Sequence, residues 1–173
     1  MKYLPFTLLS LALLLVVSAC VDNHDIPTSP VDPINLGKRK ISLDDQKSLV
    51  HGSSYLPVYP EIYQRGERRT HGLTVTVSIR NISSTDSVFI FQADYYNTKG
   101  DLIRTYLDHP VFIQPLETIE IVIDEADRTG GTGANFIVAW AIRNQVHEPL
   151  LEAVMISTTG QQGLSFTTRG VKR

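Results

Sequence analysis

Cysteine is almost absent from this sequence, since Cys20 is the only one in 173 residues. Without a second thiol the chain cannot form an intrachain disulfide. Small exported domains often depend on disulfides for stability, so this one must be stabilised by ordinary burial of apolar side chains. The position of the lone cysteine, close to the N-terminus, indicates processing chemistry rather than a structural crosslink.

A strong excess of charge is also missing. The chain holds 16 Lys and Arg residues against 18 Asp and Glu residues, which gives a formal net charge of −2 at pH 7. Proteins that bind DNA or RNA usually carry a basic patch that neutralises phosphates. We therefore expect no nucleic-acid partner.

Only the N-terminus contains a long apolar run. Residues 8–17 follow the positive Lys2, and this run has the length of the apolar core of a secretory signal. A membrane-spanning helix would need about 20 apolar residues, and Lys2 and Cys20 bracket a shorter stretch. The run ends in Val17-Ser18-Ala19-Cys20, which resembles the bacterial lipobox, whose cysteine thiol receives a diacylglyceryl group. We therefore predict a lipoprotein signal peptide over residues 1–19 and lipidation, including palmitate, at Cys20.

The residues after Cys20 predict a tethered, membrane-bound protein. One acyl chain binds a membrane only marginally, and mature bacterial lipoproteins typically carry two or three. In the common enterobacterial pattern an aspartate directly after the cysteine retains the protein at the inner membrane. Here Val21 follows, which favours the periplasmic face of the outer membrane. Residues 20–52 are polar and rich in proline, so we predict a flexible tether there and a single domain over residues 53–173.

The domain lacks a convincing amphipathic helix and shows strand patterns instead. Residues 73–80 alternate without a fault, with Leu73, Val75, Val77 and Ile79 on one face. Pro57 favours an edge strand or extended segment for residues 53–59. Further β-rich runs occupy residues 88–96, 101–107, 111–113, 118–123, 136–142, 151–157 and 164–168. About seven short strands predict an all-β fold, an antiparallel β-sandwich of immunoglobulin or fibronectin character. A partly open barrel is the alternative.

Six segments in order along the chain form a further pattern: residues 55–59, 73–81, 94–96, 130–136, 152–156 and 165–170. Together they resemble the bacterial domain of unknown function 3124. The resemblance extends over residues 53–171, which is nearly the whole predicted domain. That family is uncharacterised, so the resemblance implies one domain in an envelope setting and no activity, cofactor or catalytic residue.

The most suggestive chemistry lies in residues 124–135. The segment combines carboxylates, hydroxyls and glycines, and the candidate ligand-binding residues are Asp124, Glu125, Asp127, Thr132 and Asn135. Calcium prefers such oxygen ligands, although the spacing is not that of an EF-hand, and a phosphate-binding loop would need a lysine that is missing. The other interpretation is a solvated loop whose glycines permit tight turns. Calcium is thus the one cofactor that this segment suggests.

No catalytic or metal motif stands out elsewhere. His24, His51, His71, His109 and His147 show no spacing typical of metal ligands, and Asp108-His109 would need a nucleophile from another part of the chain. We therefore expect a non-catalytic binding or interaction module whose partner is an envelope protein or a glycan. The alternative is a small-ligand or calcium-binding protein that uses residues 124–135. A hydrolase with Asp108 and His109 comes third.

Overall fold

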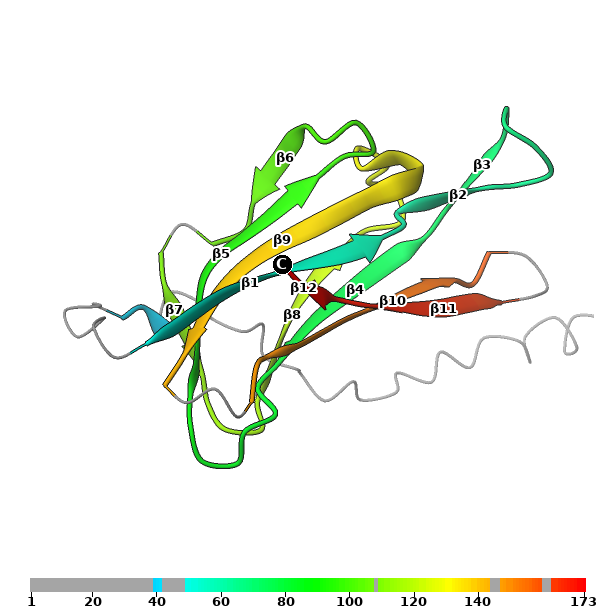
Figure 1. Cartoon of the computed structure of the whole chain (residues 1–173). Helices are drawn as coiled ribbons and strands as arrows, with labels where there is room; N and C mark the ends of the chain where they lie inside the picture. Colours follow the sequence, from blue (N-terminus) through cyan, green and yellow to red (C-terminus); the bar gives the residue numbers. More distant parts are fainter. Residues whose placement is uncertain (1–38, 42–48, 108, 144–146, 160–162) are drawn as a thin grey trace, which may run out of the picture. The chain divides into compact units, whose positions relative to one another are not determined.

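The computed structural model describes residues 39–41, 49–107, 109–143, 147–159 and 163–173 (Figure 1). The predicted signal peptide, Cys20, most of the predicted tether and Asp108 lie outside these residues. The described chain forms strands in two facing antiparallel sheets and one small hairpin, and it contains no α-helix. The predicted antiparallel β-sandwich is confirmed. Twelve strands are present in place of about seven, because short pairings such as β2 and β3 carry no clear alternation.

The first sheet contains six strands. Its order is β12 (Val171–Lys172), β1 (Val50–Val58), β9 (Ala134–Ile142), β5 (Val88–Tyr96) and β6 (Leu102–Thr105), and β7 (Val111–Ile113) also pairs with β5. The second sheet has the order β11 (Leu164–Arg169), β10 (Leu150–Ser157), β4 (Thr74–Arg80) and β8 (Thr118–Ile123). The hairpin consists of β2 (Glu61–Tyr63) and β3 (Thr70–Gly72), and a short 3-10 turn, η3 (Gly131–Gly133), precedes β9.

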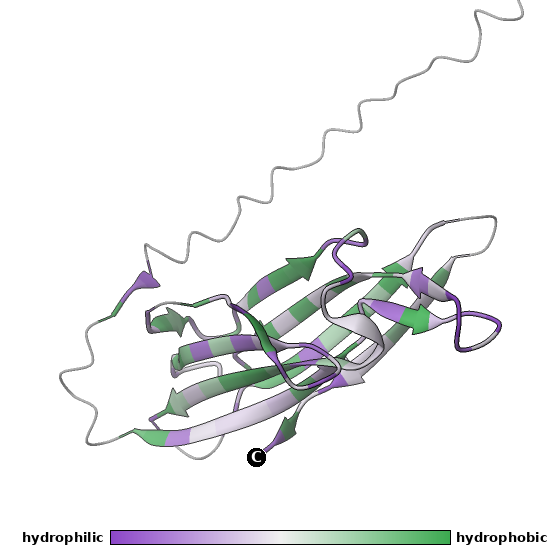
Figure 2. Ribbon diagram, turned by 90° about the horizontal axis from the view of Figure 1, so that it is seen from above, coloured by the Kyte–Doolittle hydropathy of each residue, from purple (hydrophilic) through white to green (hydrophobic). Residues whose placement is uncertain are grey.

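The core lies between the two large sheets, where alternate side chains from each sheet meet. The predicted alternation of residues 73–80 is confirmed, because Leu73, Val75, Val77 and Ile79 are fully buried. Figure 2 shows hydrophobic and hydrophilic residues alternating along the strands. Trp140 on β9 is the largest fully buried side chain, and its indole N–H donates to the Ser54 hydroxyl at 2.9 Å. The buried indole N–H therefore finds its hydrogen-bond partner within the first sheet.

Strand β5 departs from simple alternation. Its register against β9 shifts between Ile90 and Gln92, so Phe91 is an extra residue in a β-bulge. The bulge lets Ile90 and Ala93 both face the core, although three positions separate them. Strict alternation would have placed them on opposite faces.

The structure corrects the interpretation of residues 53–59 as an edge strand. Strand β1 pairs with β9 along its whole length, and β12 pairs with Ser54 and Tyr55 on its other side. Pro57 lies beyond this second pairing, so its missing N–H costs no ladder hydrogen bond. The proline is therefore compatible with a strand that has neighbours on both sides only at Ser54 and Tyr55.

Part of the segment predicted to be a tether contacts the domain. Lys40 forms an isolated bridge with Val111 of β7, and the Ile41 N–H donates to the Pro110 carbonyl at 3.2 Å. The Arg39 guanidinium binds both carboxylate oxygens of Glu117, at 2.6 and 2.5 Å. Hydrogen bonding from Arg39 lowers the pKa of Glu117. Residues 39–41 therefore add to the edge of the first sheet before β1 begins.

Candidate functional site

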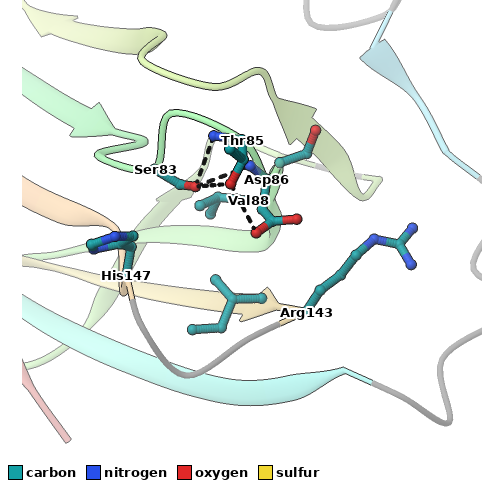
Figure 3. A pocket seen from close by; sticks show the side chains of 8 residues that line it. Ser83, Thr85, Asp86, Val88, Arg143 and His147 are labelled. Carbon is teal, nitrogen blue, oxygen red and sulfur yellow. Dashed lines mark hydrogen bonds between the residues drawn. The ribbon is translucent and has the colours of Figure 1, made fainter.

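A cavity of about 160 Å³ lies at the end of the sandwich where β5 begins and β9 ends (Figure 3). Its floor is apolar and its rim is polar. The residues that line it are Ser83, Thr85, Asp86, Ser87, Val88, Ile142, Arg143 and His147. This volume suits one small ligand, because pockets for drug-sized molecules usually exceed about 300 Å³.

A buried asparagine fixes one side of the cavity. Asn81 is 2% exposed, and its side-chain amide donates to the carbonyls of Asp86, Ile113 and Gln114 at 2.7, 3.2 and 3.0 Å. Its own carbonyl accepts the Ser83 N–H at 2.9 Å. Four hydrogen bonds on one buried side chain tie the turn after β4 to the segment that follows β7. The rim of the cavity is therefore held in place by the fold.

The turn itself is closed by a serine. The Ser83 hydroxyl accepts the N–H groups of Thr85 and Asp86 at 3.2 and 3.0 Å, a local pattern in which a short side chain replaces a backbone acceptor. The Thr85 hydroxyl donates to the Asp86 carboxylate at 3.3 Å. These bonds present a carboxylate and hydroxyls along one wall.

Arg143 and His147 complete the lining of the cavity. The Arg143 guanidinium lies 5.6 Å from the centre of the Phe89 ring, a cation–π contact that orients it. Figure 3 shows His147 and Arg143 on opposite sides of the cavity, with the turn that carries Asp86 between them. Val88 and Ile142 belong to adjacent strands and pair directly, which places their side chains together on the floor.

The carboxylates predicted to bind a ligand in residues 124–135 each have a partner within the protein. Asp124 accepts the Ala126 N–H at 2.8 Å, and Glu125 accepts the Thr159 hydroxyl at 3.0 Å. Asp127 accepts the N–H and hydroxyl of Thr129 at 3.2 and 2.6 Å. It also pairs with Arg104 at 3.1 Å. Hydrogen bonding from Thr129 and the pairing with Arg104 lower the pKa of Asp127.

The other two predicted residues lie further along the chain. Thr132 belongs to η3, and Asn135 is the second residue of β9, where it pairs with Pro57 and Tyr96. In the described parts of the chain no three His, Cys, Asp or Glu side chains come close enough together to hold a metal ion. The ligand-binding assignment of residues 124–135 stays a prediction, and the contacts described above give the loop a structural role.

The glycines of this loop contact the turn between β5 and β6. The Thr98 hydroxyl donates to the Gly130 carbonyl at 3.0 Å and accepts the Gly133 N–H at 2.9 Å. Gly131 has a φ of 71°, which favours glycine at this position. Together the two segments border a shallow hollow of about 290 Å³.

Two histidines that we considered have partners unrelated to metal binding. His71 Nε2 lies 3.0 Å from the Ser157 hydroxyl, and the His51 ring lies 5.3 Å from the ring of Phe91. Asp108 lies outside the described residues, so the Asp108-His109 assignment stays a prediction.

Sequence reasoning missed the cavity. Its turn reads Asn81-Ile82-Ser83-Ser84-Thr85-Asp86-Ser87, a run of short polar side chains between two strands. Such residues favour turns because they hydrogen-bond to nearby backbone groups, and that signal was available. The contribution of Arg143 and His147 was not, because 55 residues lie between Ser87 and Arg143 and only strand pairing brings them together.

The fold and the cavity define the class: a small antiparallel β-sandwich with a polar cavity at one end. The chain belongs to the family described as "Protein of unknown function (DUF3124)", whose family model matches residues 51–172. This confirms the family resemblance in the sequence. Within the described part of the chain, no helix has the length and apolar character needed to cross a membrane.

Other comparisons add little. No curated protein matches this chain. Among solved structures, the chain is similar to one titled "Crystal Structure of Thermotoga maritima 1070", with 12% identity and a TM-score of 0.41. The match covers 69% of this chain and 94% of the Thermotoga maritima chain.

Proposed function

We propose that this protein is a non-catalytic binding module of the bacterial cell envelope that holds an uncharged, hydroxyl-rich ligand, such as one sugar unit, in the cavity beside the Ser83–Ser87 turn. The observation that carries the proposal is the composition of the cavity, in which a carboxylate, a guanidinium and several hydroxyls surround an apolar floor. The envelope location is supported by residues 17–20, whose pattern fits lipidation at Cys20.

The charges around the cavity favour a neutral ligand. The lining holds one carboxylate, Asp86, and one guanidinium, Arg143, so it carries no excess of either sign that would select an ion. A ligand with many hydroxyl groups can instead donate to the carboxylate and accept from the guanidinium in the same pose. The hydroxyls of Thr85 and Ser87 can do either, which suits a ring with hydroxyls at several positions.

The floor and the fixed rim support the same ligand class. A sugar ring has apolar C–H faces, and Val88 and Ile142 are the apolar side chains among the residues that line the cavity. Because Asn81 already holds the turn in place, binding would order few additional groups. When little conformational entropy is lost on binding, more of the interaction free energy appears as affinity. This matters for a small ligand because it makes few contacts.

Binding of simple probes tests this function. Backbone NMR shifts are followed while glucose, N-acetylglucosamine, inorganic phosphate or ethanolammonium is added to the protein. We expect an uncharged sugar to move the signals of residues around Ser83–Ser87 and Arg143, and the two ions to leave them unchanged. Arg143→Gln should weaken sugar binding about tenfold, equivalent to about 1.4 kcal/mol.

Arg68→Gln is the matched control, because Arg68 is exposed in the turn of the β2–β3 hairpin and does not line the cavity. It should bind sugar like the unmodified chain. Stronger shifts with phosphate than with either sugar would contradict the proposal, as would sugar-induced shifts confined to other surfaces.

A further inference from the structure

Strand β8 forms one edge of the second sheet. The strand order is β11-β10-β4-β8, so β8 pairs only with β4, over six residues from Thr118 to Ile123. In an antiparallel strand every second residue directs its N–H and C=O groups away from a given neighbour. No backbone hydrogen bond joins the outward groups of β8 to another segment of the described chain. The edge can therefore accept another strand.

The sequence of β8 is that of an interior strand. It reads Thr-Ile-Glu-Ile-Val-Ile, and its pairing with β4 has no bulge. Proteins normally protect a free edge with lysine, proline, a bulge, a very short strand or a covering segment. Strand β8 has none of the first four, and Val122 on its outer face is 59% exposed. Only Glu120 places a charge on the outer face of the strand.

The other edges of the two sheets are protected. Strand β12 has two residues, the pairing of β6 with β5 contains a register shift, and Lys40 bridges to β7. Strand β11 lies beside β1 of the first sheet, where the Thr168 hydroxyl donates to the Pro57 carbonyl at 2.6 Å, and it ends in the charged Arg169. The lack of protection at β8 is therefore a local feature that sets this edge apart.

We propose that β8 pairs antiparallel with β8 of a second copy of this chain, with Ile121 at the two-fold axis. A continuous sheet requires that paired residues point to the same side, so only every second register is allowed. Centring on Glu120 would set two glutamates directly opposite each other, and centring on Val122 would set Glu120 opposite Asp124. Like charges in these positions are destabilising.

Centring on Ile121 avoids both repulsions. Glu120 then lies beside Val122 of the partner, Thr118 lies beside Asp124, and Ile119 lies beside Ile123. The isoleucines continue the buried face of each sandwich, and the two four-stranded sheets join into one sheet of eight strands. A two-fold axis lets the same edge serve both copies, which is the commonest symmetry of protein dimers.

Disulfide trapping tests the register. Full-length chains with Glu120→Cys and with Val122→Cys carry different tags and are expressed together, then oxidised. Directly opposite residues in an antiparallel pair have Cα atoms about 4.5 to 5.5 Å apart, which suits a disulfide. We expect the mixed 120–122 disulfide to exceed either same-residue disulfide about tenfold, and the chain with Cys20 alone to give none through this edge.

A charge placed on the edge tests the interface without changing the core. Val122→Lys should give a monomer in sedimentation velocity, and it should still unfold in one cooperative transition, at a melting temperature that no longer depends on protein concentration. Val154→Lys is the control, because Val154 is 37% exposed on the same sheet but lies on the inner strand β10, and this variant should stay dimeric. Equal amounts of all disulfides, a monomeric unmodified chain, or crosslinks from β8 to a different protein would overturn the proposal.

Discussion

Glycine at position 130 is fixed by packing, not by backbone conformation. Its φ and ψ are −71° and −26°, which any residue adopts, yet a Cβ there would lie 2.0 Å from the Tyr95 hydroxyl oxygen and 2.8 Å from Pro60 and Ala134. Tyr95 is fully buried, and its hydroxyl has no hydrogen-bond partner among the described residues. Burial, with a further contribution from Asp127, raises the pKa of Tyr95. The loop can close over this tyrosine only because residue 130 has no side chain.

Gly130→Ala should therefore destabilise the fold by about 1 to 3 kcal/mol, as overpacking of a rigid core usually does. The measurement is the free energy of unfolding by urea. Gly133→Ala is the control, because its Cβ would meet Thr98 at an ordinary 3.5 Å and should change little. Adding Tyr95→Phe to Gly130→Ala should restore part of the loss, because the clashing oxygen is removed. Simple additivity of the two changes would contradict this explanation.

Among the elements, the loop before β9 shows how an acidic segment is used by the fold. Asp127 joins it to Arg104 on β6, and Arg104 also donates to the Tyr106 hydroxyl at 2.8 Å and lies 5.4 Å from the ring centre of Tyr106. The ring of Tyr106 packs against the rings of Tyr95 and Phe136, which also stack on each other. The ion pair thus connects the loop, through Arg104 and Tyr106, to an aromatic cluster of the core.

This attachment predicts a pH dependence. The folded-state pKa of Asp127 lies below the ordinary value of 3.8, so its stabilising contribution is present above that value and is lost as the pH falls through the lower, folded-state pKa. Asp127→Asn should lower the unfolding free energy by about 1 kcal/mol at neutral pH. It should also make the acid side of the stability curve less steep, as measured by melting between about pH 2 and pH 7.

Asp124→Asn serves as the control for that experiment, because the Asp124 carboxylate accepts one N–H and forms no ion pair among the described residues. Its stability should stay within about 0.5 kcal/mol of the unmodified chain. Added calcium that raises the melting temperature of the unmodified chain, but not of Asp127→Asn, would instead support the ligand-site prediction for residues 124–135.

At the scale of the whole molecule, the chain that leads from the predicted anchor to the domain is first described at Arg39. The bidentate pair with Glu117 holds residues 39–41 beside β7, so only 18 residues separate Cys20 from the first described contact. Lipidation at Cys20 would then keep the β-sandwich close to the membrane surface.

Cys20→Ser tests the anchor. The thiol is the only group that can form the lipid thioether, so the variant should no longer incorporate labelled palmitate and should leave the membrane fraction. Unmodified chain labelled in parallel gives the reference, and Val21→Ala, which keeps the thiol, should label normally. Undiminished labelling of Cys20→Ser would contradict lipidation at this residue.

The sequence predicted the fold class and most strands because their signals are local. Alternation over residues 73–80 matches β4, and the runs at residues 88–96, 111–113 and 118–123 coincide with β5, β7 and β8. Strands β2, β3 and β12 were missed, since they are equally short or shorter than β7 but, unlike its Val111–Ile113 run, do not consist only of β-branched and aromatic residues. Their existence depends on the partner strand that happens to lie beside them.

The sequence by itself determined the single cysteine, the family and the β-sandwich class, because composition, short motifs and periodicity are written along the chain, and it is the sole basis for the predicted lipidation at Cys20. Tertiary structure alone decided that the Ser83–Ser87 turn faces Arg143 and His147, that the acidic loop is tied to Arg104, and that β8 is a bare edge. These features depend on strand order and register. Strand order and register are both set by contacts between residues far apart in sequence. The apolar and polar pattern of one strand does not say which other strand will pair with it.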